Sequence, residues 1–171
     1  MQYIFLLLFS FTLSYSDILS INSFEADFNQ TITDEKGKVL QYQGHVSSMK
    51  PKFALWSYLS PIKKDIYIQQ RVVTIVEPEI EQVIIKHISS DYDFFTIIQN
   101  AKKIEKNKYL ALFQEHEYTI ELLNSKIHSI SYKDEFDNET LILFSKQQQN
   151  EKIAKEVFIP KYSLEYDIIQ E

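Results

Sequence analysis

Hydrophobic and polar residues alternate through most of the chain from Phe24 onward. Phe24, Ala26, Phe28 and Ile32 share one parity, while the positions between them over 24–32 are polar or charged. A period of two is typical of a β-strand with one apolar and one solvated face. Related patterns predict further strands at 39–48, 53–59, 65–70, 71–76, 82–88, 108–113, 117–123, 126–132, 140–145 and 156–159. Their connections are short, which predicts antiparallel neighbours in one large meander of about ten strands.

Helical signals are few. Residues 17–22 are long enough for one or two turns, and Ser90-Asp91 would cap a longer helix. The apolar stripe of that helix would consist of Phe94, Phe95, Ile97, Ile98, Ala101 and Ile104. So little helix cannot cover a large sheet as a separate layer. We therefore expect a mainly β fold with a few helices (α+β), in which a curled antiparallel sheet forms an incomplete barrel and short helices close its opening.

The interior of such a sheet has two possible states. It is either filled by side chains or left as an apolar cavity, and periodicity alone does not distinguish them.

The first sixteen residues differ from the rest. They contain no charged side chain, and an apolar run extends from Ile4 to Leu13. The run is too short for a lasting membrane span, which needs about 20 residues. Ser14 and Ser16 supply small residues before a possible cleavage site. We expect a secretory signal peptide over 1–16 and a single exported domain over 17–171.

Composition excludes several functional classes. The chain of 171 residues contains two glycines, no cysteine and a formal net charge of −6. Dinucleotide-binding fingerprints and phosphate-binding loops need several glycines at fixed spacing, so both are excluded. The absence of cysteine excludes disulfides and thiolate zinc sites. The acidic balance disfavours a nucleic-acid partner, and we expect no cofactor.

The sequence offers little for catalysis. The four histidines are far apart and form no metal-binding motif, so we expect no metal site. Glu79 and Glu81 could serve as paired carboxylates, and an exported carboxylate-dependent hydrolase is an alternative on that basis. The pair lies beside Pro78 in a predicted turn, for which a solvated hairpin is the simpler interpretation. We expect that the protein is not an enzyme.

Four short motifs occur in order along the chain. They are F-E-A-D-F-N-Q at 24–30, Lys50-Pro51 followed by Trp56 and Tyr58, P-E-I-E-Q-V at 78–83, and F-I-P at 158–160. In this combination the chain resembles the LolA family, the periplasmic carriers of outer-membrane lipoproteins. The corresponding family motifs are F-x-A-x-F-x-Q, R-P-x-x-x-x-W-x-Y, P-x-x-E-Q-V and F-x-P. The resemblance extends over residues 23–159, nearly the whole of the predicted domain.

The resemblance implies a barrel-like interior that shelters the acyl chains of lipoproteins. It implies loading by a lipoprotein-releasing ABC transporter of the inner membrane and delivery to an outer-membrane acceptor or to the outer membrane itself. We accordingly expect a periplasmic chaperone that acts as a monomer. A LolA-like lipid-binding or sensor module of the cell envelope is the alternative, whereas the related acceptor LolB would need a cysteine for acylation.

Parity and the resemblance together select candidate site residues. The predicted cavity is lined by Ala54, Trp56, Tyr58, Ile66, Ile68, Val73 and Ile75, the last two with ambiguous parity. Phe94, Phe95 and Ile98 would form a lid that leaves the cavity when cargo enters. In the family an arginine holds the lid through helical backbone, and Lys50 occupies that position without the planar guanidinium fork. The alternative for the apolar residues is packing in an ordinary core.

Overall fold

The structure of the protein, a computed structural model, describes residues 18–88 and 94–171. Within these residues twelve strands form one sheet, which confirms the predicted mainly β class. The strands are β1 (Ser23–Thr33), β2 (Val39–Met49), β3 (Phe53–Ser60), β4 (Lys64–Gln69), β5 (Val72–Glu77), β6 (Gln82–His87), β7 (Ala101–Glu105), β8 (Lys108–Phe113), β9 (His116–Leu123), β10 (Lys126–Lys133), β11 (Glu139–Gln149) and β12 (Asp167–Gln170). The helical segments are η1 (Ile18–Ser20), η2 (Pro78–Ile80), α1 (Phe94–Gln99) and η3 (Lys155–Phe158).

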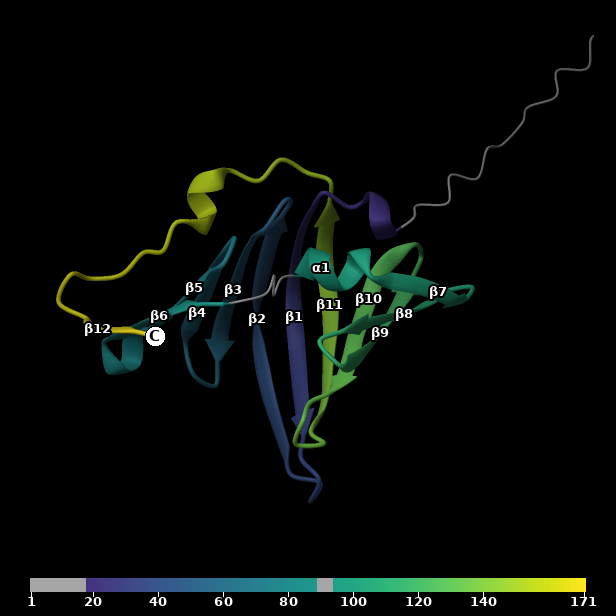
Figure 1. Ribbon diagram of the computed structural model, residues 1–171, viewed down its shortest axis with the longest axis horizontal. Helices are drawn as coiled ribbons and strands as arrows, with labels where there is room; N and C mark the ends of the chain where they lie inside the picture. The colour runs from purple at the N-terminus through teal and green to yellow at the C-terminus, as the bar shows by residue number, and fades with distance from the viewer. Residues whose placement is uncertain (1–17, 89–93) are drawn as a thin grey trace, which may run out of the picture.

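The strand order departs from the single meander that the alternation predicted. It reads β12-β6-β5-β4-β3-β2-β1-β11-β10-β9-β8-β7 (Figure 1). Strands β1–β6 form one meander and β7–β11 form a second, and the two meet where β1 pairs with β11. Between the meanders the chain returns through α1 to the opposite edge of the sheet. This crossover brings α1 against one face of the central strands (Figure 1).

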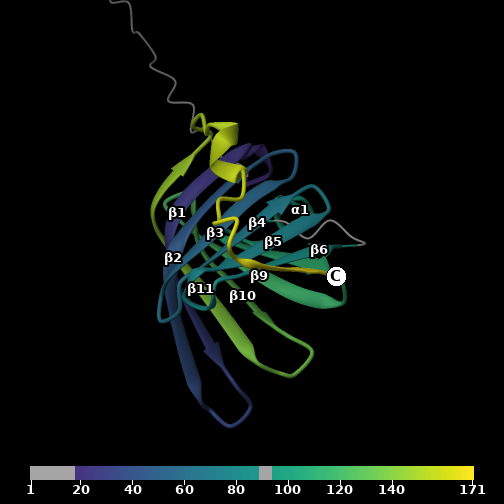
Figure 2. The ribbon, with the colours of Figure 1, turned by 90° about the vertical axis from the view of Figure 1, so that its left-hand side faces the viewer.

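The sheet is open and strongly twisted. β12 and β7 lie at its two edges, and Figure 2 shows the strands fanning about the long central ones. The right-handed twist that strands share explains this shape. At the turn between β1 and β2, Gly37 has φ 78°, the left-handed conformation that glycine adopts without strain. The connection between β1 and β2 is therefore a tight turn, in agreement with the short connections predicted between strands.

The predicted long helix is wrong in its second half. α1 ends at Gln99, where the amide of Asn100 donates from Nδ2 to the Thr96 carbonyl at 2.8 Å. The following residues form β7, in which Ala101 is opposite Ala111 of β8. Backbone pairing with β8 outweighs the local helical pattern there. The predicted cap at Ser90-Asp91 lies outside the described residues.

The C-terminal region also differs from the prediction. The strand expected over 156–159 is the 3-10 helix η3, and the unpredicted β12 follows it. β12 pairs with β6 in the parallel direction, with Ile169 opposite Ile84. The C-terminal segment thus returns to the sheet and supplies its edge strand.

Two hydrophobic cores lie on opposite faces of this sheet. We call the face that carries Phe28 the inner face and the other the outer face. The larger core is on the inner face of β1 and β8–β11, where α1 and η1 cover it. The smaller core is on the outer face of β4–β6, around Tyr67, Val76 and Val83, against the C-terminal segment. None of the helices among the described residues is long and apolar enough to span a bilayer.

Candidate functional site

The strand registers place all seven predicted cavity residues on the inner face. One row of cross-strand partners reads Val46, Trp56, Ile66, Ile75 and Ile84, and the next reads Ser48, Ala54, Ile68, Val73 and Lys86. Tyr58 is opposite Gly44, which is itself opposite Phe28. The ambiguous parity of β5 is resolved because β4 fixes its register. The seven side chains therefore share one continuous surface.

This surface is covered unevenly. Ala54 is fully buried, while Trp56 and Tyr58 are partly buried and pack against the larger core. Four further side chains are also only partly buried, and they belong to neither core: Ile66, Ile68, Val73 and Ile75. We call these four, together with Ile84, the open strip. It is an apolar surface without a partner layer among the described residues.

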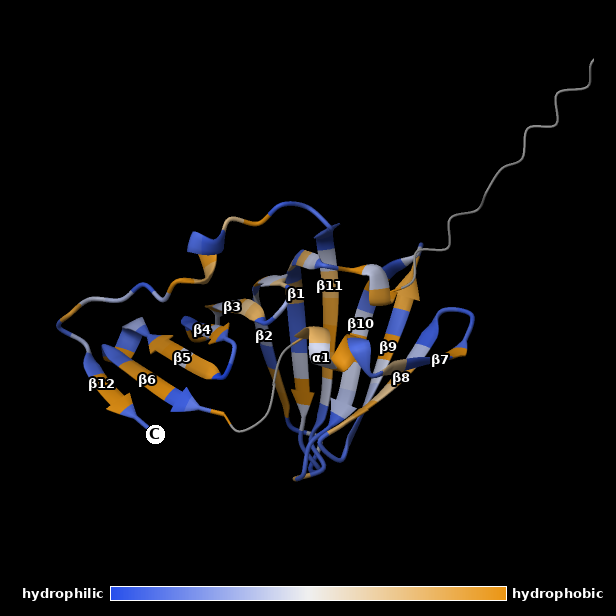
Figure 3. Cartoon of the chain, turned by 45° about the horizontal axis from the view of Figure 1, so that its top comes forward, coloured by the Kyte–Doolittle hydropathy of each residue, from blue (hydrophilic) through white to orange (hydrophobic). Residues whose placement is uncertain are grey.

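Ile84 of the open strip was not predicted from the sequence, and neither was Ile169 of β12, which extends the strip to the sheet edge. Ile84 is opposite Ile75, and Ile169 of β12 is opposite Ile84 and is 40% exposed. Figure 3 shows hydrophobic residues along β4, β5, β6 and β12. The sequence did not assign Ile84 to a face of the sheet, because Val83–Ile85 is an apolar run without alternation. The strand that contains Ile169 was not predicted, because it is short and its partner strand is distant in the sequence.

The predicted lid residues lie over the other half of the inner face. Phe94, Phe95 and Ile98 of α1 are all buried. The Phe94 ring stacks on Phe24 at a centroid distance of 4.7 Å and meets the edge of Phe144 at 6.3 Å. α1 is thus packed on β1 and β11, beside the open strip and not on top of it.

Lys50 connects the elements that cover the larger core. Its Nζ donates to the Leu19 carbonyl of η1 at 3.2 Å and lies 5.5 Å from the centroid of the Phe95 ring on α1. A cation over an aromatic face is attracted by the ring quadrupole. One side chain from the β2–β3 turn therefore contacts both helical segments.

A polar cluster borders the open strip at its β3–β4 end. The Tyr58 hydroxyl donates to Gln30 Oε1 at 3.0 Å. Lys64 Nζ lies 4.8 Å from the Tyr58 ring centroid and 5.9 Å from that of Tyr42. Burial, reinforced by Tyr132 and Tyr42, raises the pKa of Tyr58 to about 12. The hydroxyl therefore stays protonated and acts as a hydrogen-bond donor at neutral pH.

Phe28 and Gly44 explain how Tyr58 packs against the larger core. A side chain at Gly44 would collide with the Phe28 ring and with the Ser57 carbonyl. The bare backbone lets the Phe28 ring approach, and this ring meets Tyr58 edge-on at 5.1 Å. Glycine at this position thus allows aromatic rings to gather on the inner face.

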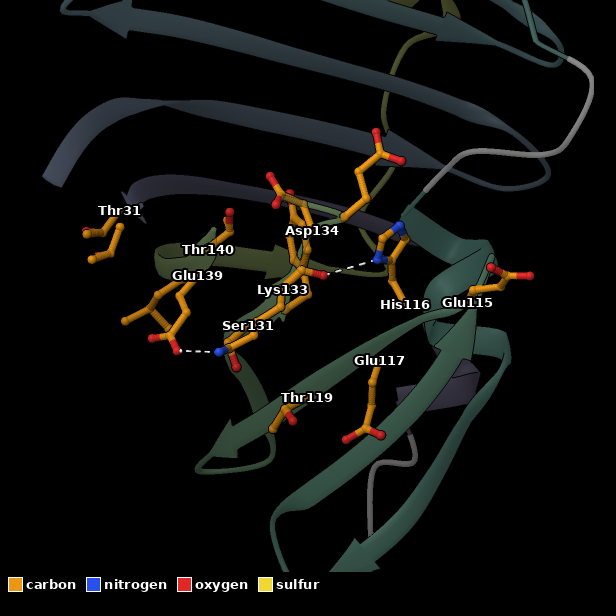
Figure 4. A pocket seen from close by; sticks show the side chains of 14 residues that line it. Thr31, Glu115, His116, Glu117, Thr119, Ser131, Lys133, Asp134, Glu139 and Thr140 are labelled. Carbon is orange, nitrogen blue, oxygen red and sulfur yellow. Dashed lines mark hydrogen bonds and ion pairs between the residues drawn. The ribbon is translucent and has the colours of Figure 1, made fainter. Parts of the chain in front are cut away.

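A hollow of about 880 Å³ lies elsewhere, lined mostly by polar residues (Figure 4). Part of the hollow is lined by side chains on the outer face of β1, β11 and β10. There Leu141 is the cross-strand partner of both Thr31 and Ser131. A 3.0 Å ion pair joins Lys133 to Glu139 at its rim, and His116 Nδ1 lies 3.1 Å from the Lys133 carbonyl. None of the predicted site residues lines it or either of the two smaller described hollows.

The residues considered for catalysis do not converge. Glu79 and Glu81 are exposed in the turn between β5 and β6, and neither lines a described hollow. His45 Nδ1 lies 2.9 Å from Asp27 Oδ1 on the outer face. No group of three or more potential metal ligands occurs among residues 18–88 and 94–171.

Comparison with known proteins gives a consistent result. The family model described as "Outer membrane lipoprotein carrier protein LolA" matches residues 19–120. The outer-membrane lipoprotein carrier protein of Campylobacter jejuni is 41% identical over 152 residues, 89% of each chain. That of Wolinella succinogenes is 34% identical over 154 residues, again 89% of each chain. A LolA superfamily protein from Nitrosomonas europaea has a similar fold, with a TM-score of 0.53 at 10% identity over 82% of this chain and 91% of that one.

Proposed function

Because this chain belongs to the LolA family of outer-membrane lipoprotein carrier proteins, we propose that it binds the acyl chains of lipoproteins and carries them across the periplasm to the outer membrane. The open strip is the surface that would receive the acyl chains. Its half-buried isoleucines beside a densely packed core are the observation that carries the proposal.

The energetics suit a carrier. Each CH₂ group that is buried contributes about 0.8 kcal/mol. Exposing one acyl chain to water therefore costs on the order of 10 kcal/mol. Aliphatic side chains on a curved sheet offset much of that cost without directional contacts that would hold the cargo too tightly. Such a surface both shields lipid from water and permits its release.

α1 would act as a lid over the part of the inner face that adjoins the open strip. Phe94, Phe95 and Ile98 would move away from the inner face as acyl chains spread from the open strip towards the larger core. Lys50 would hold the closed arrangement through Leu19 and Phe95, and its contacts would break on opening. The binding surface would then extend to Ala54, Trp56 and Tyr58.

Membership of the family supports the following proposed cellular setting. Residues 1–16 would be removed as a signal peptide on export to the periplasm; they lie outside the described residues. An inner-membrane lipoprotein-releasing ABC transporter would load the protein, and an outer-membrane acceptor or the membrane itself would receive the cargo. The protein would act as a monomer, without cofactor or catalytic activity. A lipid-binding or sensor module would use the same strip without delivering cargo.

The test is binding of a diacylated lipopeptide to the purified protein. Trp56 is the single tryptophan and lies beside Ile66, so its fluorescence should shift to the blue on loading. Ile75→Gln, in the centre of the open strip, should weaken binding at least tenfold with little loss of stability. Ile159→Gln is the matched control, because Ile159 is 53% exposed and follows η3 on the outer-face side.

Two results would contradict the proposal. One is a wild-type protein that does not bind the lipopeptide. The other is equal binding by the Ile75→Gln and Ile159→Gln variants, which would place the ligand elsewhere.

A further inference from the structure

Gln30 is a buried amide with unused hydrogen-bonding capacity. It is 8% exposed on the inner face of β1. Its Oε1 accepts a hydrogen bond from the Tyr58 hydroxyl, while its Nε2 has no acceptor among residues 18–88 and 94–171. Buried amide donors are nearly always paired, and an unpaired one costs free energy. The Gln30 Nε2 group therefore requires an acceptor that the described chain does not provide.

Lys64 brings a positive charge to the same place. Its ammonium lies over the Tyr58 and Tyr42 rings and has no carboxylate partner in the described part of the chain. The two rings meet edge to face at 5.7 Å and hold the lysine stem against the inner face. Lys64 directly precedes the open strip, since Ile66 is the next inner-face residue on β4.

These side chains offer unengaged donors beside an apolar surface. The Tyr58 proton is used in the hydrogen bond to Gln30 Oε1, which leaves the Gln30 amide hydrogens and the Lys64 ammonium as donors. The complementary chemistry is an oxygen acceptor, neutral or anionic, attached to an aliphatic chain.

We propose that Gln30, Tyr58 and Lys64 form a subsite for the carbonyl or carboxylate oxygens that join an acyl chain to its polar head. This inference rests on the proposed function, because the acyl chain itself would lie on the open strip. Tyr58 positions the Gln30 amide, while Gln30 and Lys64 contact the oxygens. The ester carbonyls of a diacylglyceryl group and the carboxylate of a free fatty acid are the two sources of such oxygens.

The experiment compares ligands that differ only in these oxygens. A peptide with an S-diacylglyceryl-cysteine is titrated against its dialkyl ether analogue of equal chain length, with Trp56 fluorescence as the signal. In a second arm, palmitate is compared with hexadecanol. The wild type should prefer the diester over the diether by about three- to tenfold, the amount expected for one or two hydrogen bonds.

Two variants and a matched control locate the preference. Lys64→Met and Tyr58→Phe should each reduce the ratio of diester to diether affinity to near unity. Lys63→Met removes the same charge from the neighbouring exposed position, which makes no described contact, and should keep the preference. Lys64→Met changes a partly exposed side chain, so it tests the subsite even if Tyr58→Phe proves unstable.

The outcomes separate the two proposals. Diether binding without ester preference, together with equal binding of palmitate and hexadecanol, or a preference that survives in both variants, overturns the subsite and leaves the carrier function intact. A preference confined to palmitate over hexadecanol identifies a fatty acid as the source of the oxygens. Failure of every ligand to bind the wild type overturns the carrier function and the subsite with it.

Discussion

The two halves of the sheet bury opposite faces. In β1 and β8–β11, the inner face packs against α1 and η1, with Phe24 fully buried. In β4–β6, the outer face is buried around Tyr67, and Tyr162 and Tyr166 of the C-terminal segment pack against it. The first half thus uses its inner face for stability. The second half is stabilised from its outer face, and its inner face has no covering layer among the described residues.

This difference shows how one sheet can combine a rigid core with a free apolar surface. A half-sheet covered on neither face would be unstable, and one covered on both would have no surface to offer. The change of face occurs across β2 and β3, where Val46 and Ala54 are fully buried although the open strip begins on the next strand. In β4–β6 the smaller core and the proposed binding surface thereby lie on opposite sides of the same strands.

The largest effect should come from the core of the first half. Phe24→Ala removes a ring that stacks on Phe94 and meets the edge of Phe144 at 5.2 Å. We expect the free energy of unfolding in urea to fall by about 3–5 kcal/mol. Leu143→Ala, on the outer face of β11, is the control, because Leu143 is 38% exposed. A loss below about 1 kcal/mol for Phe24→Ala would contradict the account of this core.

A somewhat smaller effect is expected from the cover of the second half. Phe158 is fully buried, its ring centroid is 5.7 Å from that of Phe53, and its carbonyl accepts a hydrogen bond from Gln69 Nε2 at 2.9 Å. Phe158→Ala should cost about 3 kcal/mol, because the segment around it can partly relax. Hydrogen exchange should accelerate in β5 and β6 and remain slow in β1.

Ile159→Ala is the control for that substitution, since Ile159 is exposed. Equal acceleration of exchange in both halves of the sheet would show that the two cores are not separate units.

The smallest effect is expected on the outer face of the first half, which carries charge instead of a core. The His45 ring and the Lys146 ammonium, at 2.9 and 3.0 Å, hold the pKa of Asp27 below its usual range. A lowered pKa in the folded state adds stability above the usual aspartate pKa, and this is lost as the pH falls through the folded value. Because the groups are largely exposed, Asp27→Asn should cost less than about 1 kcal/mol at pH 7.

The stability difference between Asp27→Asn and the wild type should shrink at pH 3, measured by urea unfolding. Glu35→Gln, in the exposed β1–β2 turn, is the control for the loss of one acidic side chain. A stability difference between the two proteins that grows on acidification would contradict a stabilising role for the ionised Asp27.

Much of the sheet could be predicted because alternation is a local property. Phe24, Ala26 and Phe28 indicated the inner face of β1 without knowledge of its neighbours. Pairing is not local: Ala101–Glu105 follows a helix and reads as its continuation, and only contact with β8 makes it a strand. The short β12 depends in the same way on β6.

The candidate site was predictable in part for the same reason. Trp56 and Tyr58 share a parity that the sequence displays, whereas Val73 and Ile75 needed the β4 register. The polar cluster was not predictable, because Gln30 and Lys64 come from β1 and β4 and meet only through Tyr58. The sequence does contain a sign of the second core. β4 reads K-D-I-Y-I-Q, in which Tyr67, between two inner-face isoleucines, places a large aromatic side chain on the outer face as well.

The pairing of β1 with β11 imposes an order on folding. Register partners run from Phe24 with Gln149 to Thr33 with Glu139, so one edge of the first strand finds its neighbour only after nearly the whole chain is present. Loop closure over such a separation makes folding slow. Until then a long strand edge stays unpaired and open to misassociation. A chain that is synthesised from its N-terminus therefore passes through an interval in which β1 lacks its partner β11.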